Sequence, residues 1–314
     1  MPPEPPYGVI WNRLKAGKVV PFLGAGASFV GRSPDARWDA DKPAFLPSGI
    51  ELAHFLADEA MFPSTIPSDR DDLAKVSSYY ADISGRRTLR ERLREVLNHD
   101  YQSGPLHEFL ASLSPCLVIV VTNYDTLIEQ AFRAAGKPYD LVIYPADPPK
   151  DKANTILWWQ HGAPEPEFKA ANELDIDLAG TNVIYKMHGT IVRETNEWDN
   201  FVITEEDYVE FLSRMTTNTA VPALFYEYFR ERSFLFLGYS LRDWNLRVVL
   251  KNLSKYLSSS KRIADEDEEV LPSWAIQRNP SELERKLWEK RNVNIFDVAL
   301  DEFINKLRER QKGG

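Results

Sequence analysis

Short apolar runs with almost no polar interruption recur along the chain, and segments with apolar residues at helical spacing separate them. The runs occupy residues 18–23, 117–121, 182–187, 233–237, 272–277 and 293–296. A short run without polar alternation is typical of a strand that is buried on both faces. Strands that alternate with helices in this way predict an α/β protein, with a Rossmann-like parallel sheet and helices on both faces.

The region between the first two predicted strands has a helical pattern. Ser48 followed by Glu51 has the spacing of a capping box, and apolar residues at helical spacing follow. Residues 71–81 and 88–97 predict two more helices, and the alternating charges of the second are typical of a solvated helix face. We interpret residues 1–314 as a single domain with a helical insertion at about 48–113, which could cover a site.

Other segments complete the prediction. Further helices are expected at residues 9–15, 126–135, 204–211, 242–256, 281–291 and 299–310. Loops are expected at 29–48 and 258–269, and 145–182 is irregular because five prolines interrupt it. The whole chain therefore alternates between the two kinds of element, without an internal repeat.

Composition excludes several classes of protein. The 314 residues carry a net charge of −9, which argues against direct nucleic-acid binding. The single cysteine, Cys116, excludes a disulfide framework and zinc sites built on paired cysteines. No apolar run reaches the ~18–20 residues of a membrane span. The N-terminus lacks the features of a signal peptide, so we expect a cytoplasmic protein.

Four of the predicted strands end in segments with unusual chemistry. These segments are Gly24–Ser28, Asn123–Asp125, His188-Gly189 and Gly238–Ser240. In an open α/β sheet, ligands bind outside the carboxyl ends of the strands, so we expect one site that all four segments form. Small glycines let the backbone approach a phosphate, and the amides at the start of the next helix are free to bind an anion.

Each of these residues also has a plain structural interpretation. The glycine turn lacks the third glycine of the dinucleotide-binding fingerprint, because Phe29 occupies that position, which disfavours a conventional dehydrogenase. Asn123 could be a turn residue, and Asp125, Ser28 and Ser240 could be helix caps.

The other histidines are weaker candidates. His161-Gly162 repeats the histidine–glycine pair after Trp158-Trp159, but prolines follow it and no strong strand is predicted before it. The two tryptophans are expected in the core or an interface. The remaining histidines are expected to be structural or exposed: His54, His99 and His107.

Four motifs in order resemble the sirtuin-like superfamily, and more narrowly the bacterial sirtuin-like domains of antiphage defence systems. They are Phe22-Leu-Gly-Ala-Gly-Ala-Ser28, Thr122-Asn-Tyr-Asp125, Lys186-Met-His-Gly189 and Gly238-Tyr-Ser240. The resemblance covers residues 18 to about 300. It implies a Rossmann-like fold that binds NAD, with His188 as the catalytic base.

The resemblance also assigns roles to the other motif residues. Asn123 is expected near the nicotinamide ribose, with Asp125 as a supporting catalytic residue. The residues expected to hold the NAD phosphates and ribose are Gly24, Ala25, Gly26, Ser28, Gly238 and Ser240. Thr122 stands where deacylases of the superfamily have glutamine, and their four-cysteine zinc module is absent. These departures disfavour lysine deacylation.

The resemblance therefore implies an enzyme that hydrolyses NAD to nicotinamide and ADP-ribose, without a metal, as the effector of a defence system. A module that binds NAD or ADP-ribose without turnover is the alternative, and a deacylase or ADP-ribosyltransferase is less favoured. A chain of this length leaves little room for a sensor. The implied partners are further copies in a homo-oligomer and a separate sensor, either a HerA-type ATPase translocase or a short Argonaute protein. Contact with a membrane is not expected.

Overall fold

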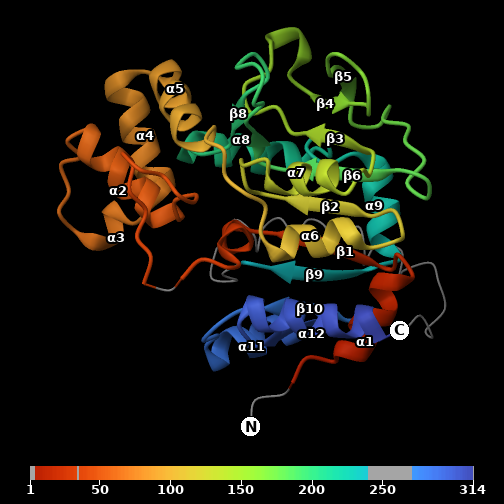
Figure 1. Ribbon diagram of the computed structural model, residues 1–314. Helices are drawn as coiled ribbons and strands as arrows, with labels where there is room; N and C mark the ends of the chain where they lie inside the picture. The colour runs from red at the N-terminus through yellow and green to blue at the C-terminus, as the bar shows by residue number, and fades with distance from the viewer. Residues whose placement is uncertain (1–3, 34, 240–270, 314) are drawn as a thin grey trace.

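A nine-stranded sheet forms the centre of the computed structural model, which describes residues 4–33, 35–239 and 271–313 (Figure 1). The strand order is β11-β10-β9-β1-β2-β6-β3-β4-β5. The strands are β1 (Val19–Leu23), β2 (Val118–Val121), β3 (Tyr139–Ile143), β4 (Thr155–Trp159), β5 (Glu167–Ala170), β6 (Asn182–Lys186), β9 (Ser233–Leu237), β10 (Ser273–Ile276) and β11 (Val293–Phe296). Strands β7 (Gly189–Thr190) and β8 (Asn200–Phe201) form a separate pair.

The predicted parallel sheet is confirmed: seven of these strands pair in parallel, six of them at the predicted positions, whereas β3 was not predicted. The pairings of β4 with β3 and with β5 are antiparallel, so the sheet ends in a hairpin that the sequence did not predict. The chain adds β2, β3 and β6 on one side of β1, and it later adds β9, β10 and β11 on the other side. The strand order thus reverses at β1, and a ligand crevice is expected at the carboxyl ends of β1 and its neighbours.

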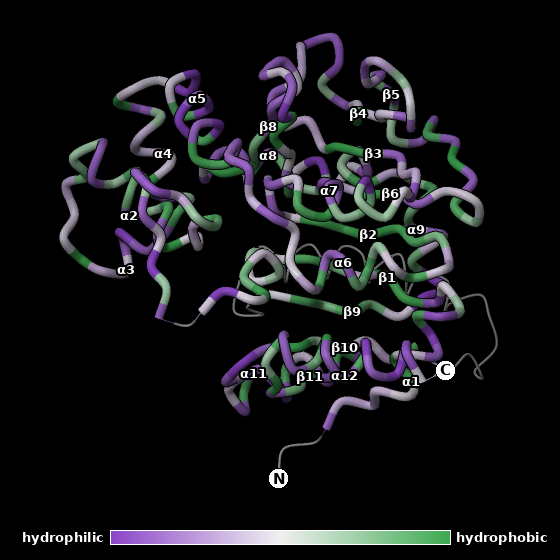
Figure 2. The backbone as a smooth tube through the Cα atoms, in the orientation of Figure 1, coloured by the Kyte–Doolittle hydropathy of each residue, from purple (hydrophilic) through white to green (hydrophobic). Residues whose placement is uncertain are grey.

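Each central strand contributes to two apolar cores, because successive side chains point to opposite faces. Val20 and Phe22 of β1 join one core, whereas Val19 and Leu23 join the other. Full burial of such a side chain contributes about 1.5–3 kcal/mol to the free energy of unfolding. Figure 2 shows the resulting band of hydrophobic residues along the central strands. This double burial explains why the strands appear as unbroken apolar runs in the sequence.

Helices cover both faces of the sheet, as predicted. One face is covered by α1 (Tyr7–Lys15), α6 (Pro105–Ser112), α7 (Leu127–Ala134) and α12 (Leu300–Gly313). The other face is covered by α8 (Glu205–Thr216), α9 (Ala223–Arg230) and α11 (Glu282–Glu289). The sequence did not predict α6 or α9. The predicted helix at 242–256 and loop at 258–269 lie outside the described residues.

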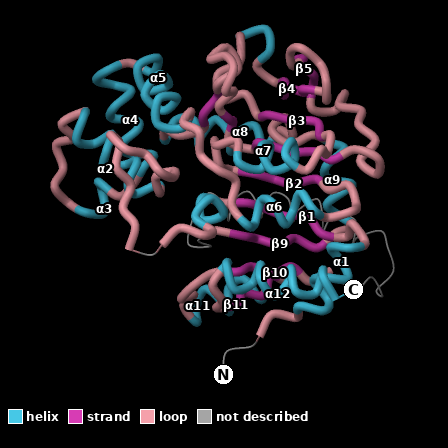
Figure 3. Tube along the Cα trace, viewed as in Figure 1, coloured by secondary structure: helices cyan, strands magenta, loops and turns pink. Residues whose placement is uncertain are grey.

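A second group of helices lies beside the sheet (Figures 1 and 3). It comprises α2 (Gly49–Glu59), α3 (Pro67–Arg70), α4 (Leu73–Ser84) and α5 (Arg86–Leu97). The predicted capping box of Ser48 and Glu51 is present at the start of α2. The apolar core of this group also contains Leu127 and Ile203, from the sheet side of the chain.

We refer to residues 46–97 as the helical segment. Its status as an insertion in a single domain stays a prediction. Among the described residues, no helix has the length and apolar content to cross a lipid bilayer.

Candidate active site

The carboxyl ends of β1, β2, β6 and β9 open into a cavity of about 320 Å³. Six of the residues predicted for the site line this cavity: Ala25, Ser28, Asn123, Asp125, His188 and Gly238. Gly24 and Gly26 lie beside it but are not among its lining residues. Ser240 is outside the described residues. The topology therefore brings together residues up to about 200 positions apart, as the convergence of parallel strand ends requires.

The glycines of this site pack two loops against each other. The Gly26 amide donates to the Gly238 carbonyl oxygen at 2.8 Å, and the Gly24 amide donates to the Leu237 oxygen at 3.0 Å. Gly238 has a φ of +74°, and a Cβ atom there would lie 2.1 Å from the Ala27 nitrogen. Only glycine fits such a close approach at positive φ. These glycines therefore have a packing function, and their contact with a phosphate stays a prediction.

The amides of the glycine turn are less available to an anion than the sequence implied. The Gly24 amide is engaged by the last residue of β9 and the Gly26 amide by Gly238 after it, and the Ala27 amide donates to the Gly24 oxygen at 2.8 Å. The segment Ala25–Phe29 is a short 3₁₀ helix rather than the start of an α-helix. A phosphate at this turn would have to contact other donors, such as side chains.

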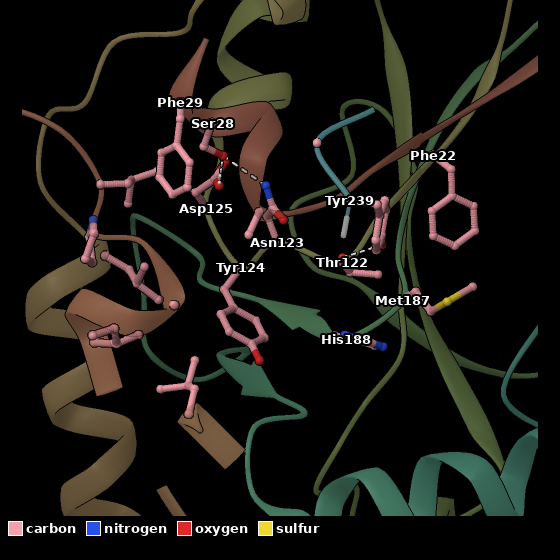
Figure 4. A pocket seen from close by; sticks show the side chains of 18 of the residues that line it. Phe22, Ser28, Phe29, Thr122, Asn123, Tyr124, Asp125, Met187, His188 and Tyr239 are labelled. Atoms are coloured by element: carbon pink, nitrogen blue, oxygen red, sulfur yellow. Dashed lines mark hydrogen bonds between the residues drawn. The ribbon is translucent and has the colours of Figure 1, made fainter. Parts of the chain in front are cut away.

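Ser28, Asn123 and Asp125 form one hydrogen-bonded chain (Figure 4). Asn123 Nδ2 donates to Ser28 Oγ at 2.9 Å, and Ser28 Oγ donates to Asp125 Oδ2 at 2.8 Å. Asn123 Nδ2 also donates to the Gly24 carbonyl oxygen at 3.1 Å, which fixes the orientation of the amide. This orientation leaves Asn123 Oδ1 as an acceptor for a ligand.

Asp125 is not the N-cap of α7 that its sequence position allowed, because Thr126 is the N-cap residue. Its Oδ1 accepts from the Leu127 amide at 3.0 Å, and its Oδ2 accepts from Ser28 Oγ. The residue is 7% exposed, so little of it is open to a ligand, and each carboxylate oxygen already accepts one hydrogen bond. The position is therefore suited to orienting Ser28 and Asn123 rather than to attacking a substrate.

His188 lies at the end of β6 and lines the same cavity, in an aromatic environment. Its ring contacts Tyr208 and Phe211 edge-on, with ring centroids 5.5 Å and 5.1 Å away. Burial lowers the pKa of His188 to about 4, so the imidazole is neutral at pH 7. Nε2 is buried and has no hydrogen-bond partner among the described residues. An unpartnered buried nitrogen costs about 1–3 kcal/mol, and a ligand that supplies a partner recovers it.

Several residues of the cavity were not predicted. Tyr239 OH and Thr122 Oγ1 lie 2.5 Å apart in a hydrogen bond (Figure 4), and Tyr124 OH donates to the Val202 oxygen at 2.6 Å. Tyr124 and Tyr239 lie within the motifs at 122–125 and 238–240, so the sequence could have indicated that both belong to the site. The helical segment supplies an apolar wall of Leu46, Leu52, Leu73 and Leu97. The sequence predicted that helices of this region could cover a site, but it did not single out these four residues.

The other histidines lie away from this cavity. His161 is exposed in the turn between β4 and β5, so a strand does precede it, contrary to expectation. His107 is buried in α6. Cys116 is a free cysteine. Within the described part of the chain, no group of His, Cys, Asp and Glu side chains could hold a metal ion.

Comparisons with known proteins agree with this arrangement. Residues 117–296 match the SIR2-like domain family. The chain is 29% identical over 197 residues to the NAD(+) hydrolase ThsA of Enterococcus faecium, covering 61% of this chain and 34% of that protein. It is 22% identical over 295 residues to defense-associated sirtuin 2 of Bacillus subtilis, covering 92% of this chain and 24% of that protein. The ThsA protein of Acinetobacter baumannii is 28% identical over 61% of this chain and 33% of its own length. The chain thus spans about a quarter to a third of the relatives that it matches.

Proposed function

This chain belongs to the SIR2-like domain family, and on that premise we propose that it hydrolyses NAD⁺ to nicotinamide and ADP-ribose as an effector of bacterial antiphage defence. Relatives that carry the names of NAD⁺ hydrolases and of a defense-associated sirtuin support the proposal. The observation that carries it is the neutral His188, which lines the same cavity as Asn123 and whose buried Nε2 has no hydrogen-bond partner among the described residues.

The proposed reaction breaks the bond between the nicotinamide nitrogen and C1′ of the ribose. NAD⁺ and water give nicotinamide, ADP-ribose and one proton. Positive charge develops on the ribose as this bond lengthens, as in glycoside hydrolysis. A neutral imidazole can accept the proton of the attacking water, and His188 is the neutral base that lines the cavity.

The remaining residues position the substrate and the water. Asn123 Oδ1 can accept from a ribose hydroxyl or from the water, while Ser28 and Gly24 hold its amide in place. Asp125 acts through Ser28. The apolar wall from the helical segment limits the access of bulk water to the reacting carbon. Because NAD⁺ is the substrate, this chemistry requires no resident cofactor.

A second candidate is a module that binds NAD⁺ or ADP-ribose without turnover. The same pKa of about 4 favours it, because a base of such low pKa is weak at neutral pH. The two candidates differ in whether nicotinamide is released. Binding without release, in the presence of any partner that copurifies with the protein, would favour the binding module.

The test is an assay of nicotinamide release from NAD⁺ by the purified protein, alone and with its copurifying partner. Asn123→Ala removes the amide that bonds Gly24 and Ser28, and it should lower the rate about 100-fold or more. Asn294→Ala, at an exposed position in β11, is the control and should retain the full rate. Equal rates in the two variants would contradict the assigned site.

We further propose that the protein assembles as a homo-oligomer and that a separate sensor partner, of the HerA or short Argonaute type, triggers it. The relatives that the chain matches are three to four times longer than the matched region, which leaves them room for functions outside it. Light scattering would give the mass of the purified protein. Mass spectrometry of copurifying proteins would identify a sensor.

A further inference from the structure

The strand that leads to His188 carries a lysine inside the sheet. Lys186 opens the motif Lys186-Met-His-Gly189, but the proposed reaction gives its side chain no role. It is the last residue of β6 and is fully buried, as are its neighbours Tyr185 and Met187. A buried charge is costly unless it is paired and hydrogen-bonded. The contacts of Lys186 therefore indicate what a cation does at this position.

Lys186 contacts two groups of the segment that follows β2. Its Nζ donates to the backbone oxygen of Asp125. It also lies 3.3 Å from Oε1 of Glu129 on α7, whose side chain is 3% exposed. Both carboxylate oxygens of Glu129 are buried and accept no hydrogen bond from the described residues, so the charge of Lys186 offsets theirs. The pair is thus enclosed by protein and closed to a ligand.

The bond from Lys186 to the Asp125 backbone supports the loop that carries Asn123. Within the described residues, no other group donates to this buried oxygen. The Asp125 carboxylate accepts from Ser28 Oγ, which in turn accepts from Asn123 Nδ2. A chain of contacts therefore leads from Lys186 to Asn123. Without the lysine, a buried carbonyl would lack a donor, and a shift of the loop would relieve that cost.

Backbone hydrogen bonds also join these two segments. The Met187 amide donates to the Val121 oxygen at 2.9 Å. The Ile191 amide donates to the Tyr124 oxygen at 3.0 Å. Such bonds can form with almost any side chain at these positions, whereas the bond of Lys186 requires a long side chain with a donor at its end. The lysine is therefore the sequence-specific part of the link between the ends of β2 and β6.

We propose that Lys186 is a positioning residue of the reaction: it fixes the loop that presents Asn123 to the substrate, and Glu129 keeps the lysine in place. This inference rests on the proposed function, because it concerns the rate of nicotinamide release. Lys186 is not among the residues that line the cavity, so it acts through Asp125 and Ser28. A displacement of about 1 Å at a reacting group can cost about 100-fold in rate, so one lost bond behind the site is sufficient for a large effect.

The test replaces both members of the pair, because removal of one would leave the other charge buried and uncompensated. Lys186→Met/Glu129→Gln keeps the approximate shapes of both side chains, and it removes both charges and the donor to Asp125. We expect kcat for nicotinamide release to fall about 10- to 100-fold. We expect KM for NAD⁺ to change less than about threefold, because only the groups at Asn123 lose their geometry.

A matched control removes similar contacts at the opposite edge of the sheet. Arg232 directly precedes β9 and donates to the backbone oxygens of Gly17 and Tyr228, both at 3.0 Å. It also lies 3.6 Å from a Glu231 carboxylate oxygen. Arg232→Met/Glu231→Gln should therefore lower stability in urea and leave kcat unchanged. An unchanged kcat in the Lys186 double variant, or a loss of kcat that follows the loss of stability equally in both double variants, would overturn the proposal.

NMR of the Asn123 side-chain amide tests the positioning without requiring any turnover. Its signal is assigned by its loss in Asn123→Ala. Lys186→Met/Glu129→Gln should shift or broaden this signal, whereas the Arg232 double variant should leave it unchanged. If the wild type releases no nicotinamide under any condition, the proposed function fails, and the signal still decides whether Lys186 positions Asn123. An unchanged signal in the Lys186 double variant would overturn the positioning, whatever the rate.

Discussion

The start of α6 and the end of β6 each hold a histidine whose pKa is lowered to about 4, with burial as the main cause. At α6, His107 is 2% exposed and its Nδ1 accepts from the Gly104 amide at 3.3 Å, so the ring caps its own helix. At β6, the Nε2 of His188 has no partner among the described residues, and the ring lines a cavity. A lowered pKa therefore reports burial at both places, and what distinguishes His188 is that its ring lines the cavity and its Nε2 has no partner among the described residues.

The two histidines also differ in the charges around them. After burial, the pKa of His107 responds to Asp125, which raises it, and to Lys186, which lowers it. For His188, burial is the cause of the shift and its ring neighbours are aromatic. The pKa of His107 thus depends on the charges of Asp125 and Lys186, whereas His188 lines the candidate active site. This difference can be tested in three ways.

The largest expected effect is on catalysis. His188→Gln should lower nicotinamide release about 100- to 10,000-fold, the usual contribution of a general base. His107→Gln, with the same amide in place of the imidazole, should keep a rate close to that of the wild type, while its unfolding free energy falls by about 1 kcal/mol through the altered cap. Steady-state rates and urea unfolding measure both quantities. If both variants lost a comparable part of the rate, the presence or absence of a hydrogen-bond partner on the ring would not distinguish a catalytic histidine from a structural one.

Much of this comparison could be anticipated from the sequence, because strand ends meet at one edge of a parallel sheet. Asn123, Asp125 and His188 follow apolar runs that could only be buried strands, so their convergence was predictable. The hairpin of β4 and β5 was not predicted. Strand β4 contains the apolar run Ile156–Trp159, but β5 is largely polar and both strands lie among prolines.

Other features depend on distances that no local pattern encodes. The contact of Gly26 with Gly238 occupies amides that the sequence left free for an anion. Tyr208 reaches His188 from α8, about 20 residues further along the chain, and nothing in its own segment marks it. The environment of His107 was equally hidden, because α6 is a short helix after Gly104-Pro105 and its charged neighbours come from distant segments. The sequence thus indicates the candidate groups, and the folded chain determines which of them already have hydrogen-bond partners.

The second test is the dependence of stability on pH. Both histidines have a folded-state pKa of about 4 against an ordinary value of 6.5, so the unfolded chain binds protons first on acidification. Above about pH 6.5, each neutral histidine therefore makes its full contribution to the free energy of unfolding. This contribution is lost as the pH drops from 6.5 to 4, by about 1–3 kcal/mol for each histidine. Urea unfolding of His107→Gln and His188→Gln from pH 7 to pH 4.5 should show a smaller loss than the wild type in both variants. An unchanged slope in either would contradict the burial of that imidazole.

The smallest expected effect is a change in the pKa of one histidine but not of the other. It separates the causes of the two lowered pKa values. Lys186→Met combined with Glu129→Gln removes both charges of a buried ion pair, and such replacements are often neutral for stability. Lys186 lowers the pKa of His107, so the double variant should raise that pKa above about 4. The pKa of His188 should stay near 4, because burial causes its shift and the burial does not change. NMR titration of the imidazole carbon-bound protons gives both values. A rise at His188 as well would show that the charged network reaches the substrate side of the sheet, and the division between the two histidines would then be wrong.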